Sequence, residues 1–365
     1  MLDGPAPPHD EDGTNGDDHH HHHHRTQHEE FLHLVRSRGL TTIKRKQRHL
    51  LNIKPEDFLI VVDLQEDFLP PNGLFKVGHG DEVVAPICEL VEEFVSVGAY
   101  VYCSRDYHPS NHCSFDTHGG SFPRHCVQGT HGARFTEPLA QVMQHHLDPV
   151  NGPVFVVYKG FSPDVDSFGA VRYDDEILNR SPRVSRRADA PHCSSSWTGS
   201  FLLYSSNANE LKATLDHLSA AATPTTAAEA ATIVVGSSAL PSSSTAATNE
   251  KAASSMTESA AQSPSTRAKG NLYVVGLALD YCVLDTAVNA ASLKDAKDLF
   301  HSVTILVDYC RPAHVANIGP FGSGFFTDPI EFATQCRNKV ELVTFQQSAA
   351  ALAQAAVRAT DNPLA

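Results

Sequence analysis

Apolar and polar positions follow two different periods along the chain. Short apolar runs rich in β-branched residues have the length of strands that are buried on both faces of a parallel sheet. Six such runs lie at Phe58–Leu64, Ala99–Ser104, Pro153–Tyr158, Asn271–Gly276, Ser302–Asp308 and Lys339–Phe345. Apolar residues recur at helical spacing in His28–Ser37, Asp81–Val97, Ala133–His146, Asn207–Ala221, Ser348–Ala359 and a stretch after Cys282. Because strands alternate with helices, we predict a three-layer α/β/α fold with a six-stranded, mainly parallel sheet.

Two low-complexity segments interrupt this pattern. For residues 1–50 we predict a mostly disordered tail, in which the run His19–His24, natural or an expression tag, binds divalent metals loosely. The basic stretch Lys44–Arg48 is typical of a solvated linker. Residues 222–269 are dominated by Ala, Ser and Thr, and they cannot bury enough surface to offset their ordering entropy. We therefore predict one domain over residues 51–365 with a disordered insertion at about 222–269, either passive or regulated through its Ser and Thr residues.

Composition narrows the class of protein. Hydrophobic residues make up 41% and charged residues 19% of the 365-residue chain, which permits a packed core. The formal net charge of −14 argues against nucleic acid as a partner. No apolar run approaches the roughly 20 residues of a transmembrane helix, and the acidic N-terminus is not a signal peptide. The eight cysteines are scattered without a CxxC pair, so we expect a reducing, cytoplasmic location; the nucleus and the peroxisome stay open for want of a clear signal.

Reactive side chains follow several of the predicted strands. In parallel sheets the ligand lies beyond the carboxyl ends of the strands, and Asp63, Lys159 and Cys282 all fall there. A cysteine at a helix N-terminus has a favoured thiolate, and the free N–H groups beside it can hold an oxyanion. Asp63 can take the proton, and Lys159 can stabilise the charges that develop. Each residue alone also has a structural interpretation, as a buried thiol, a turn cap or a surface lysine.

The loop after the second predicted strand contains a second group of reactive residues. Asp106 and His108 form an Asp-x-His pair, His125 can supply a third metal ligand, and His112 is a possible fourth. A His/Asp set that leaves coordination positions open suits zinc, iron or manganese. The alternative is a polar loop whose histidines are bonded to backbone carbonyls.

Five segments of the chain together resemble the nicotinamidases, also called pyrazinamidases, of the isochorismatase-like cysteine hydrolases. They are DLQEDF (Asp63–Phe68), RDYHPSNHCSF (Arg105–Phe115), FPRHCVQGT (Phe122–Thr130), YKG (Tyr158–Gly160) and VVGLALDYCV (Val274–Val283). The resemblance runs from about Phe58 to about Val343, apart from the insertion. The first and last segments alone point only to the wider superfamily, whereas the Asp-x-His loop with the later His-Cys points to the nicotinamidases.

The resemblance assigns roles to these residues. It implies a catalytic triad of Asp63, Lys159 and Cys282, and a metal bound by Asp106, His108 and His125, with His112 added in some members. It also implies an oxyanion hole formed by the backbone N–H groups of Ala278 and Cys282, beside a cis peptide in the Gly276–Ala278 turn. The ring of the substrate would lie against Phe68, Phe122 and Tyr281.

The activity implied by the resemblance is hydrolysis of a linear amide. Nicotinamide would be converted to nicotinate and ammonia through a thioester on Cys282, in NAD salvage, with the metal holding the pyridine nitrogen. The family often self-associates, so a homo-oligomer is an open option. Phe122 stands where the family usually has Trp, which leaves the selectivity among pyridine carboxamides open, and the region Arg180–Ser205 is longer than the family leads us to expect.

Two other functions compete with this one. Another cysteine hydrolase of the superfamily would act on a different amide or a carbamoyl group, and such relatives generally lack the Asp106, His108 and His125 set. A catalytically inactive binding protein that keeps the fold is the third hypothesis, against which the intact Asp63, Lys159 and Cys282 argue.

Overall fold

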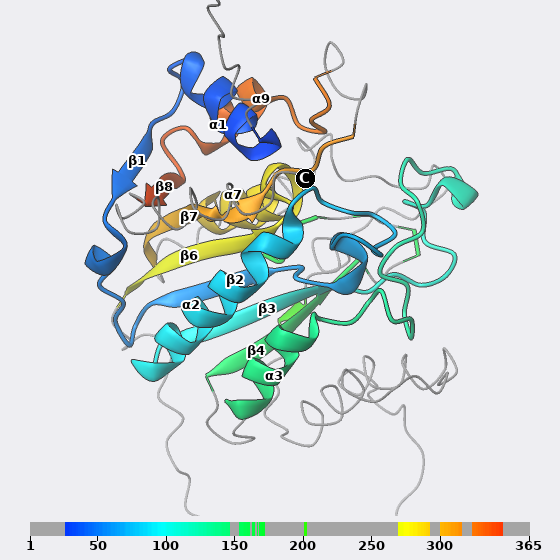
Figure 1. Ribbon diagram of the computed structural model, residues 1–365, viewed down its shortest axis with the longest axis horizontal. Coiled ribbons are helices and arrows are strands. Elements are labelled where there is room, and N and C mark those ends of the chain that lie inside the picture. Colours follow the sequence, from blue (N-terminus) through cyan, green and yellow to red (C-terminus); the bar gives the residue numbers. More distant parts are fainter. Residues whose placement is uncertain are drawn as a thin grey trace, which may run out of the picture.

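A single mixed sheet organises the part of the chain that the computed structural model describes, which comprises residues 26–146, 153–160, 163–164, 166, 168–171, 201–202, 269–292, 300–315 and 323–345. The sheet has eight strands in the order β1-β8-β7-β6-β2-β3-β4-β5 (Figure 1). The strands are β1 (Ile43–Lys46), β2 (Phe58–Val62), β3 (Tyr100–Asp106), β4 (Val154–Lys159), β5 (Phe201–Leu202), β6 (Gly270–Leu277), β7 (Phe300–Arg311) and β8 (Glu341–Phe345). Only the pairing of β4 with β5 is antiparallel.

Strand β2 lies near the middle of the sheet and shows why the apolar runs form buried strands. It pairs in parallel with β3 and with β6. Leu59 and Val61 contribute to the core on one face, and Ile60 and Val62 to the core on the other. All four side chains are at most 7% exposed, as expected for a strand that helices cover on both sides.

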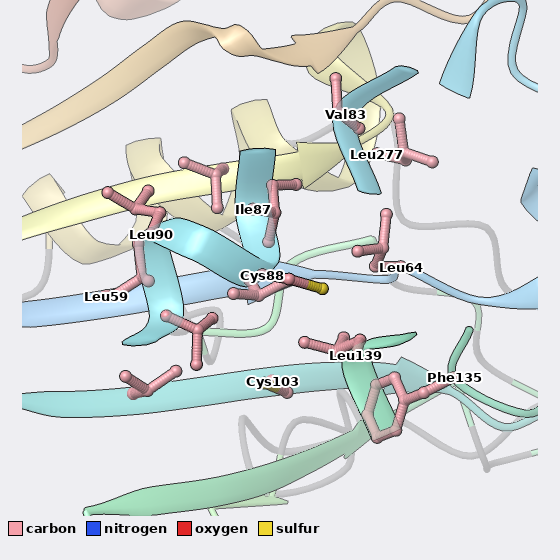
Figure 2. Close-up of a cluster of buried hydrophobic side chains, with 14 of the residues drawn as sticks. Leu59, Leu64, Val83, Ile87, Cys88, Leu90, Cys103, Phe135, Leu139 and Leu277 are labelled. Carbon is pink, nitrogen blue, oxygen red and sulfur yellow. The ribbon is translucent and has the colours of Figure 1, made fainter. Parts of the chain in front are cut away.

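Helices form a layer on each face of the sheet. The helices are α1 (Gln27–Ser37), α2 (Val84–Ser96), α3 (Glu137–His145), α7 (Leu284–Ser292) and α9 (Pro329–Cys336). Shorter helical turns lie at Arg48–Leu50, Glu66–Phe68, Gly80–Val83, Asp116–His118 and Leu279–Val283. Helices α2 and α3 cover one face, where Ile87, Leu90 and Leu139 pack on the strands (Figure 2). Helices α1, α7 and α9 contribute to the core on the opposite face, so the predicted three layers are confirmed.

The six predicted strands are all present, but the sheet has eight strands rather than six. Strand β1 occupies part of Lys44–Arg48, for which we predicted a linker, and it pairs in parallel with β8. The side chains of β1 are mostly exposed. An edge strand tolerates charged side chains because backbone hydrogen bonds hold it to its neighbour. Nζ of Lys44 lies 2.9 Å from Oε1 of Glu341 on β8. The apolar pattern could not reveal a strand with charged side chains. It could not reveal β5 either, because that strand has only two residues.

The N-terminal segment also differs from the prediction of a mostly disordered tail over residues 1–50. Helix α1 begins at a capping box, in which the side chain of Thr26 accepts the backbone N–H of Glu29 and the side chain of Glu29 accepts the backbone N–H of Thr26. Phe31 is fully buried, with its ring centroid 5.0 Å from that of Phe325 and 5.2 Å from that of Phe332. From residue 26 onward this segment therefore belongs to the folded domain.

Several predictions fall outside the described residues. They are the start of the tail at residues 1–25, the helices at 207–221 and 348–359, and the insertion at 222–269. Within the described residues, no helix has both the length and the apolarity needed to cross a membrane.

Replacing Phe31 with Ala tests the packing of α1. We expect a loss of about 3–5 kcal/mol in the free energy of unfolding, because a fully buried ring leaves a cavity between α1 and α9. Denaturant unfolding measures this loss, and His33→Ala on the exposed side of the same helix is the control, with a change within about 0.5 kcal/mol. Equal effects of the two substitutions would contradict this packing.

Candidate active site

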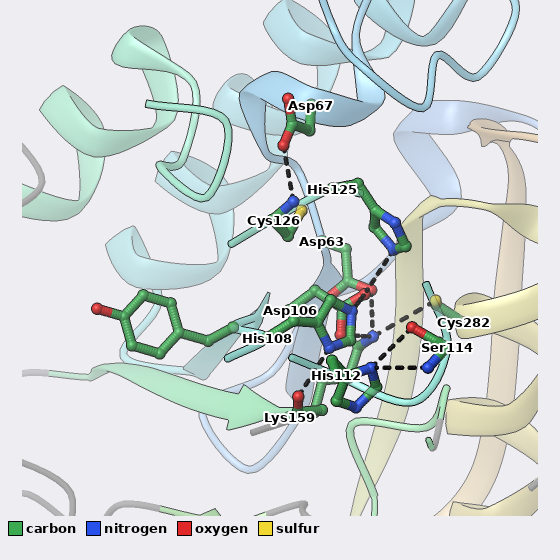
Figure 3. Close-up of polar contacts among 12 residues, drawn as sticks. Asp63, Asp67, Asp106, His108, His112, Ser114, His125, Cys126, Lys159 and Cys282 are labelled. Atoms are coloured by element: carbon green, nitrogen blue, oxygen red, sulfur yellow. Dashed lines mark hydrogen bonds and ion pairs between the residues drawn. The ribbon is translucent and has the colours of Figure 1, made fainter. Parts of the chain in front are cut away.

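Four parallel strands bring reactive residues to one edge of the sheet. Asp63 follows β2, Asp106 ends β3 and Lys159 ends β4, while β6 leads into the turn that contains Cys282. The register aligns Asp106 with Lys159 and Val62 with Gly276, so the four ends are level. Figure 3 shows that the side chains converge on one point.

The ammonium group of Lys159 lies at the centre of this cluster. Its Nζ is 2.8 Å from Asp63 Oδ2, 2.8 Å from Asp106 Oδ1 and 3.5 Å from Cys282 Sγ (Figure 3). Lys159 is 0% exposed. Burial alone would lower its pKa, but the carboxylates of Asp106 and Asp63 outweigh burial and raise the pKa well above the ordinary value. The side chain is therefore a fixed positive charge.

Asp63 is held by a serine on the neighbouring strand. It adopts a left-handed backbone conformation with φ of 48°. Ser104 Oγ donates to Asp63 Oδ1 at 2.6 Å and accepts the backbone N–H of Asp63 at 3.1 Å. Burial, partly offset by Lys159 but reinforced by Asp106, raises the pKa of the Asp63 carboxyl group. Asp63 is therefore a stronger proton acceptor than an ordinary aspartate.

Cys282 lies in a π-helical turn, Leu279–Val283, that joins β6 to α7. The peptide bond between Leu277 and Ala278 is cis, within the turn where the resemblance implied one. Cys282 is 6% exposed, and burial raises the pKa of its thiol well above the ordinary value. Lys159 lowers this pKa, whereas Asp63 and Asp106 raise it. At rest the sulfur is thus a protonated thiol beside a basic carboxylate.

A second group of side chains adjoins this cluster through Asp106. One ligand atom each of Asp106, His108 and His125 lies within 4.8 Å of the others. Asp106 Oδ2 is 3.3 Å from His108 Nε2 and 3.9 Å from His125 Nε2. The three predicted metal ligands therefore converge.

The two imidazole rings are oriented as metal ligands require. Nδ1 of His108 is 2.7 Å from the carbonyl oxygen of Gly160, and Nδ1 of His125 is 2.7 Å from that of Pro123. Because a carbonyl only accepts, each Nδ1 carries the proton, and in the neutral ring the Nε2 lone pair faces Asp106. Two imidazole lone pairs that face one carboxylate oxygen form a donor set that fits a metal ion, although a proton on Nε2 of His108 can also occupy the position between His108 and Asp106.

The charges of these groups agree with this interpretation. Burial raises the pKa of Asp106, but His108 and Lys159 outweigh burial, and the pKa falls below the ordinary value. Burial and His108 lower the pKa of His125 to about 4, so its ring is neutral at pH 7. Burial also disfavours the charge on His108, but Asp106 raises its pKa above the ordinary value, so protons compete with a metal there.

His112, the optional fourth ligand, lies in a neighbouring group. Its ring centroid is 4.1 Å from that of His108, and its Nδ1 is 2.7 Å from Ser114 Oγ. His112 and His108 share this group with Asp166, a residue that the sequence analysis did not single out. No pattern of spacing marked Asp166, because it lies in a segment without helical or strand periodicity.

A pocket with about 560 Å³ of empty space, part of it open to solvent, lies over both groups. The predicted ring contacts Phe68, Phe122 and Tyr281 all line it, as do Ala278 and Cys282. Three further aromatic side chains that sequence reasoning missed complete the wall, namely Phe75, Phe168 and Phe326. The ring centroid of Phe75 lies 5.4 Å from that of Phe122, so the two rings form adjoining parts of the pocket wall.

Two side chains of the segment after β2 hold the loops of the site. Gln65 donates to the carbonyl oxygen of Asp106 at 2.8 Å and accepts its N–H at 2.8 Å. Asp67 accepts the N–H of Cys126, the neighbour of His125, at 2.7 Å (Figure 3). A Cβ on Gly132 would approach the Asp67 carboxylate to 2.0 Å, so a side chain at this position would displace that carboxylate. Both side chains lie in the segment DLQEDF, where the strand-end rule singled out only Asp63.

Comparisons with known proteins agree with this geometry. Residues 57–148 match the isochorismatase domain. This part of the chain is thus similar to the isochorismatase domain. The resemblance that the sequence suggested is thereby confirmed.

Curated relatives of this domain are nicotinamidases. The chain is 29% identical to the nicotinamidase of Saccharomyces cerevisiae over 137 residues, which is 31% of this chain and 60% of the relative. It is 33% identical to the nicotinamidase of Escherichia coli over 131 residues, which is 32% of this chain and 57% of the relative. The chain thus spans about 60% of the length of the curated relatives it matches.

Solved structures that are similar to this chain include a nicotinamidase and a pyrazinamidase. The yeast nicotinamidase bound to the inhibitor nicotinaldehyde has a TM-score of 0.43 and 20% identity, covering 80% of this chain and 100% of that chain. The pyrazinamidase of Pyrococcus horikoshii in complex with zinc has a TM-score of 0.39 and 22% identity, with the same coverage. At these values, structural similarity alone assigns no function.

Replacing Asp63 with Asn tests the electrostatics around Cys282. The negative charge of Asp63 raises the pKa of the thiol, so its removal should lower this pKa and increase the thiolate fraction. We expect Cys282 to be alkylated by iodoacetamide faster at pH 7, by about tenfold for each unit of pKa lost. Asn tolerates the left-handed backbone of position 63.

Mass spectrometry of the peptide that contains Cys282 measures this rate. Cys88, on α2 and outside the pocket, is the internal control, because its pKa of about 11 reflects burial and nearby glutamates. An unchanged rate at Cys282 in a folded Asp63→Asn protein would show that Asp63 does not control the thiol.

Proposed function

We propose that this chain is a metal-dependent amidase of the nicotinamidase type, which hydrolyses nicotinamide to nicotinate and ammonia. The observation that carries the proposal is that Asp63, Lys159 and Cys282 adjoin the Asp106, His108 and His125 set, and that Cys282 and this set line one aromatic pocket. The curated relatives are nicotinamidases, which supports the same substrate. In the cell, the nicotinate that is formed would be used for NAD synthesis.

Cys282 is the nucleophile in this proposal. Its sulfur attacks the carboxamide carbon while Asp63 accepts the thiol proton. The C–N bond then breaks as Asp63 delivers this proton to the departing ammonia, and the acyl group remains on Cys282 as a thioester. Water hydrolyses the thioester, which releases nicotinate and regenerates the thiol.

The raised pKa values of Asp63 and Cys282 suit this proton transfer. At rest Cys282 is a neutral thiol, so no thiolate lies beside the negative charges of Asp63 and Asp106. The thiol proton moves to Asp63 only when the substrate reacts. Lys159 remains charged throughout and stabilises the negative charge on whichever neighbour carries it. The backbone N–H groups of Ala278 and Cys282 are the proposed oxyanion hole, and both residues line the pocket.

Asp106, His108 and His125 would hold one divalent ion, and zinc, iron and manganese all suit this donor set. When bound, the ion supplies an electron-pair acceptor for the ring nitrogen of a pyridine. The residues Phe68, Phe122 and Tyr281 would enclose the ring, which fixes the amide relative to Cys282.

The alternative is a hydrolase of the same family that acts on another amide or a carbamoyl group. The chemistry at Asp63, Lys159 and Cys282 would be the same. A converging metal-binding set has no task in that reaction, and this favours nicotinamide as the substrate.

Replacing Cys282 with Ala tests the nucleophile. We expect kcat for ammonia release from nicotinamide to fall by about 10³-fold or more, because no other group can form the acyl intermediate. Cys88→Ala, on α2 and outside the pocket, should keep the activity of the parent. Parent-like activity of Cys282→Ala would refute the catalytic role of Cys282, and a folded parent without activity would favour a binding protein.

Removal of the metal tests the second half of the site. We expect stripped protein to lose turnover and to regain it with Zn²⁺, Fe²⁺ or Mn²⁺. The run His19–His24 should first be replaced with Asn, because it would bind metal itself. His125→Asn should abolish the rescue, whereas His131→Asn, an exposed histidine of the same loop, should not. Full turnover without metal would point to the alternative hydrolase.

A further inference from the structure

Asp280 lies two residues before Cys282 in the π-helical turn, and its side chain bonds a separate segment of the chain. The side chain is 0% exposed. Its Oδ1 accepts the backbone N–H of Ala313 at 2.7 Å, and its Oδ2 accepts the backbone N–H of Thr327 at 3.2 Å. The hydroxyl group of Thr327 also donates to the backbone carbonyl oxygen of Asp280. The proposed reaction gives these contacts no role.

The residues that Asp280 bonds belong to two short arms of the chain, residues 313–315 and 324–327. The arms pair through an antiparallel bridge between His314 and Phe325. Each oxygen of the Asp280 carboxyl group accepts an N–H from a different arm. Four residues of the arms line the pocket, namely Ala313, His314, Val315 and Phe326.

Phe326 is the aromatic ring that the arms contribute to the pocket. Its ring centroid lies 5.5 Å from that of Tyr281, 6.0 Å from that of Phe75 and 6.1 Å from that of Phe122. Thr327, the next residue, is one of the two that Asp280 holds. The position of Phe326 relative to the other rings therefore depends on the bonds to Asp280.

We propose that Asp280 is a positioning residue, which fixes the two arms, and with them Phe326, relative to the turn that carries Cys282. It acts on the substrate through the pocket wall and does not touch the reacting atoms. The inference deepens the proposed function and rests on it, because it concerns how the same pocket holds an aromatic ring beside the nucleophile.

A carboxyl group at position 280 can bond both arms because each of its oxygens accepts an N–H. An asparagine has one oxygen, and its amide NH₂ group would face the second N–H, so one buried N–H would lose its acceptor. The turn itself has further bonds. The N–H of Val283 donates to the carbonyl oxygen of Ala278 at 3.1 Å, and the hydroxyl group of Thr286 donates to that of Cys282 at 2.6 Å. Loss of the carboxyl group should therefore displace the arms more than the thiol.

Steady-state kinetics of the metal-loaded full chain test the proposal. For Asp280→Asn we expect the KM for nicotinamide to rise by about fivefold to tenfold, with kcat within about threefold of the parent, because the wall binds the substrate and its transition state alike. Asp280→Ala loses both bonds and should raise KM further. Parent-like KM in a folded Asp280→Asn protein would overturn the proposal.

Asp308→Asn is the matched control for general loss of structure. The carboxyl group of Asp308 also accepts two hydrogen bonds, from the hydroxyl group of Thr344 and the backbone N–H of Phe345, but it does not line the pocket. We expect KM and kcat of this variant to stay within about twofold of the parent. Equal increases in KM for Asp308→Asn and Asp280→Asn would overturn the specific role of Asp280.

A second measurement needs no turnover. 2-Chloroacetamide and 2-chloroacetanilide both alkylate a thiolate with loss of chloride, but only the anilide carries an aromatic ring. The ratio of their rates at Cys282, divided by their ratio with free glutathione, reports how well the wall holds a ring. We expect Asp280→Asn to lower this ratio by about fivefold while the chloroacetamide rate stays within about twofold. Phe326→Ala should lower the ratio in the same way. An unchanged ratio in Asp280→Asn, or a parent with no preference for the ring, would overturn the proposal.

Thr327→Val covers the case in which Asp280→Asn does not fold. It removes the hydroxyl group that bonds the backbone of Asp280 and leaves the carboxyl group in place. We expect a smaller decrease of the alkylation ratio in the same direction. A ratio equal to that of the parent in this variant would count against the arms being held from the turn.

The two measurements separate this inference from the proposed function. If nicotinamide is not hydrolysed but the alkylation ratio depends on Asp280, the proposed reaction fails and the positioning role stands. If nicotinamide is hydrolysed and Asp280→Asn keeps the KM and the alkylation ratio of the parent, the positioning role fails and the proposed reaction stands.

Discussion

The buried ammonium group of Lys159 is the interaction on which the site depends. It is fully buried and meets two carboxylates at 2.8 Å and the sulfur of Cys282 at 3.5 Å. A buried ion pair stabilises a fold only weakly, and removing one partner leaves an uncompensated charge in the interior. Lys159 therefore fixes the positions of Asp63 and Asp106 relative to each other, more than it adds to stability. These are the positions that the proposed proton transfer and the metal site both require.

The parallel sheet makes this arrangement possible with short side chains. Strands β2, β3, β4 and β6 end level at one edge, so residues distant in sequence lie within hydrogen-bonding distance. Polar side chains help to hold the loops that follow, as with Gln65 on the backbone of Asp106 and Asp67 on that of Cys126. Loops fixed in this way keep His125 near Asp106 without filling the pocket.

The sequence predicted the residues whose placement follows from the strand pattern. Asp63, Lys159 and Cys282 were found because the ends of apolar strands are visible as a pattern and the ends of parallel strands share an edge. Strand β1 escaped because its side chains are charged and its pairing depends on the backbone. Asp166 and the rings of Phe168 and Phe326 escaped because they lie outside the strands and helices that the apolar pattern reveals. The segment DLQEDF was noticed as a motif, but the roles of Gln65 and Asp67 depend on partners far along the chain.

Asp106 joins the two halves of the site into one electrostatic unit. Its Oδ1 contacts Lys159 at 2.8 Å, and its Oδ2 lies 3.3 Å from Nε2 of His108. A divalent charge at Oδ2 would draw electron density from the carboxylate and weaken its hold on Lys159. The ammonium would then interact more strongly with Asp63 and with the sulfur of Cys282, both of which change charge in the proposed reaction. The metal-binding residues thus influence the nucleophile through one shared carboxylate, and substitutions in the two halves should not be additive in their effects.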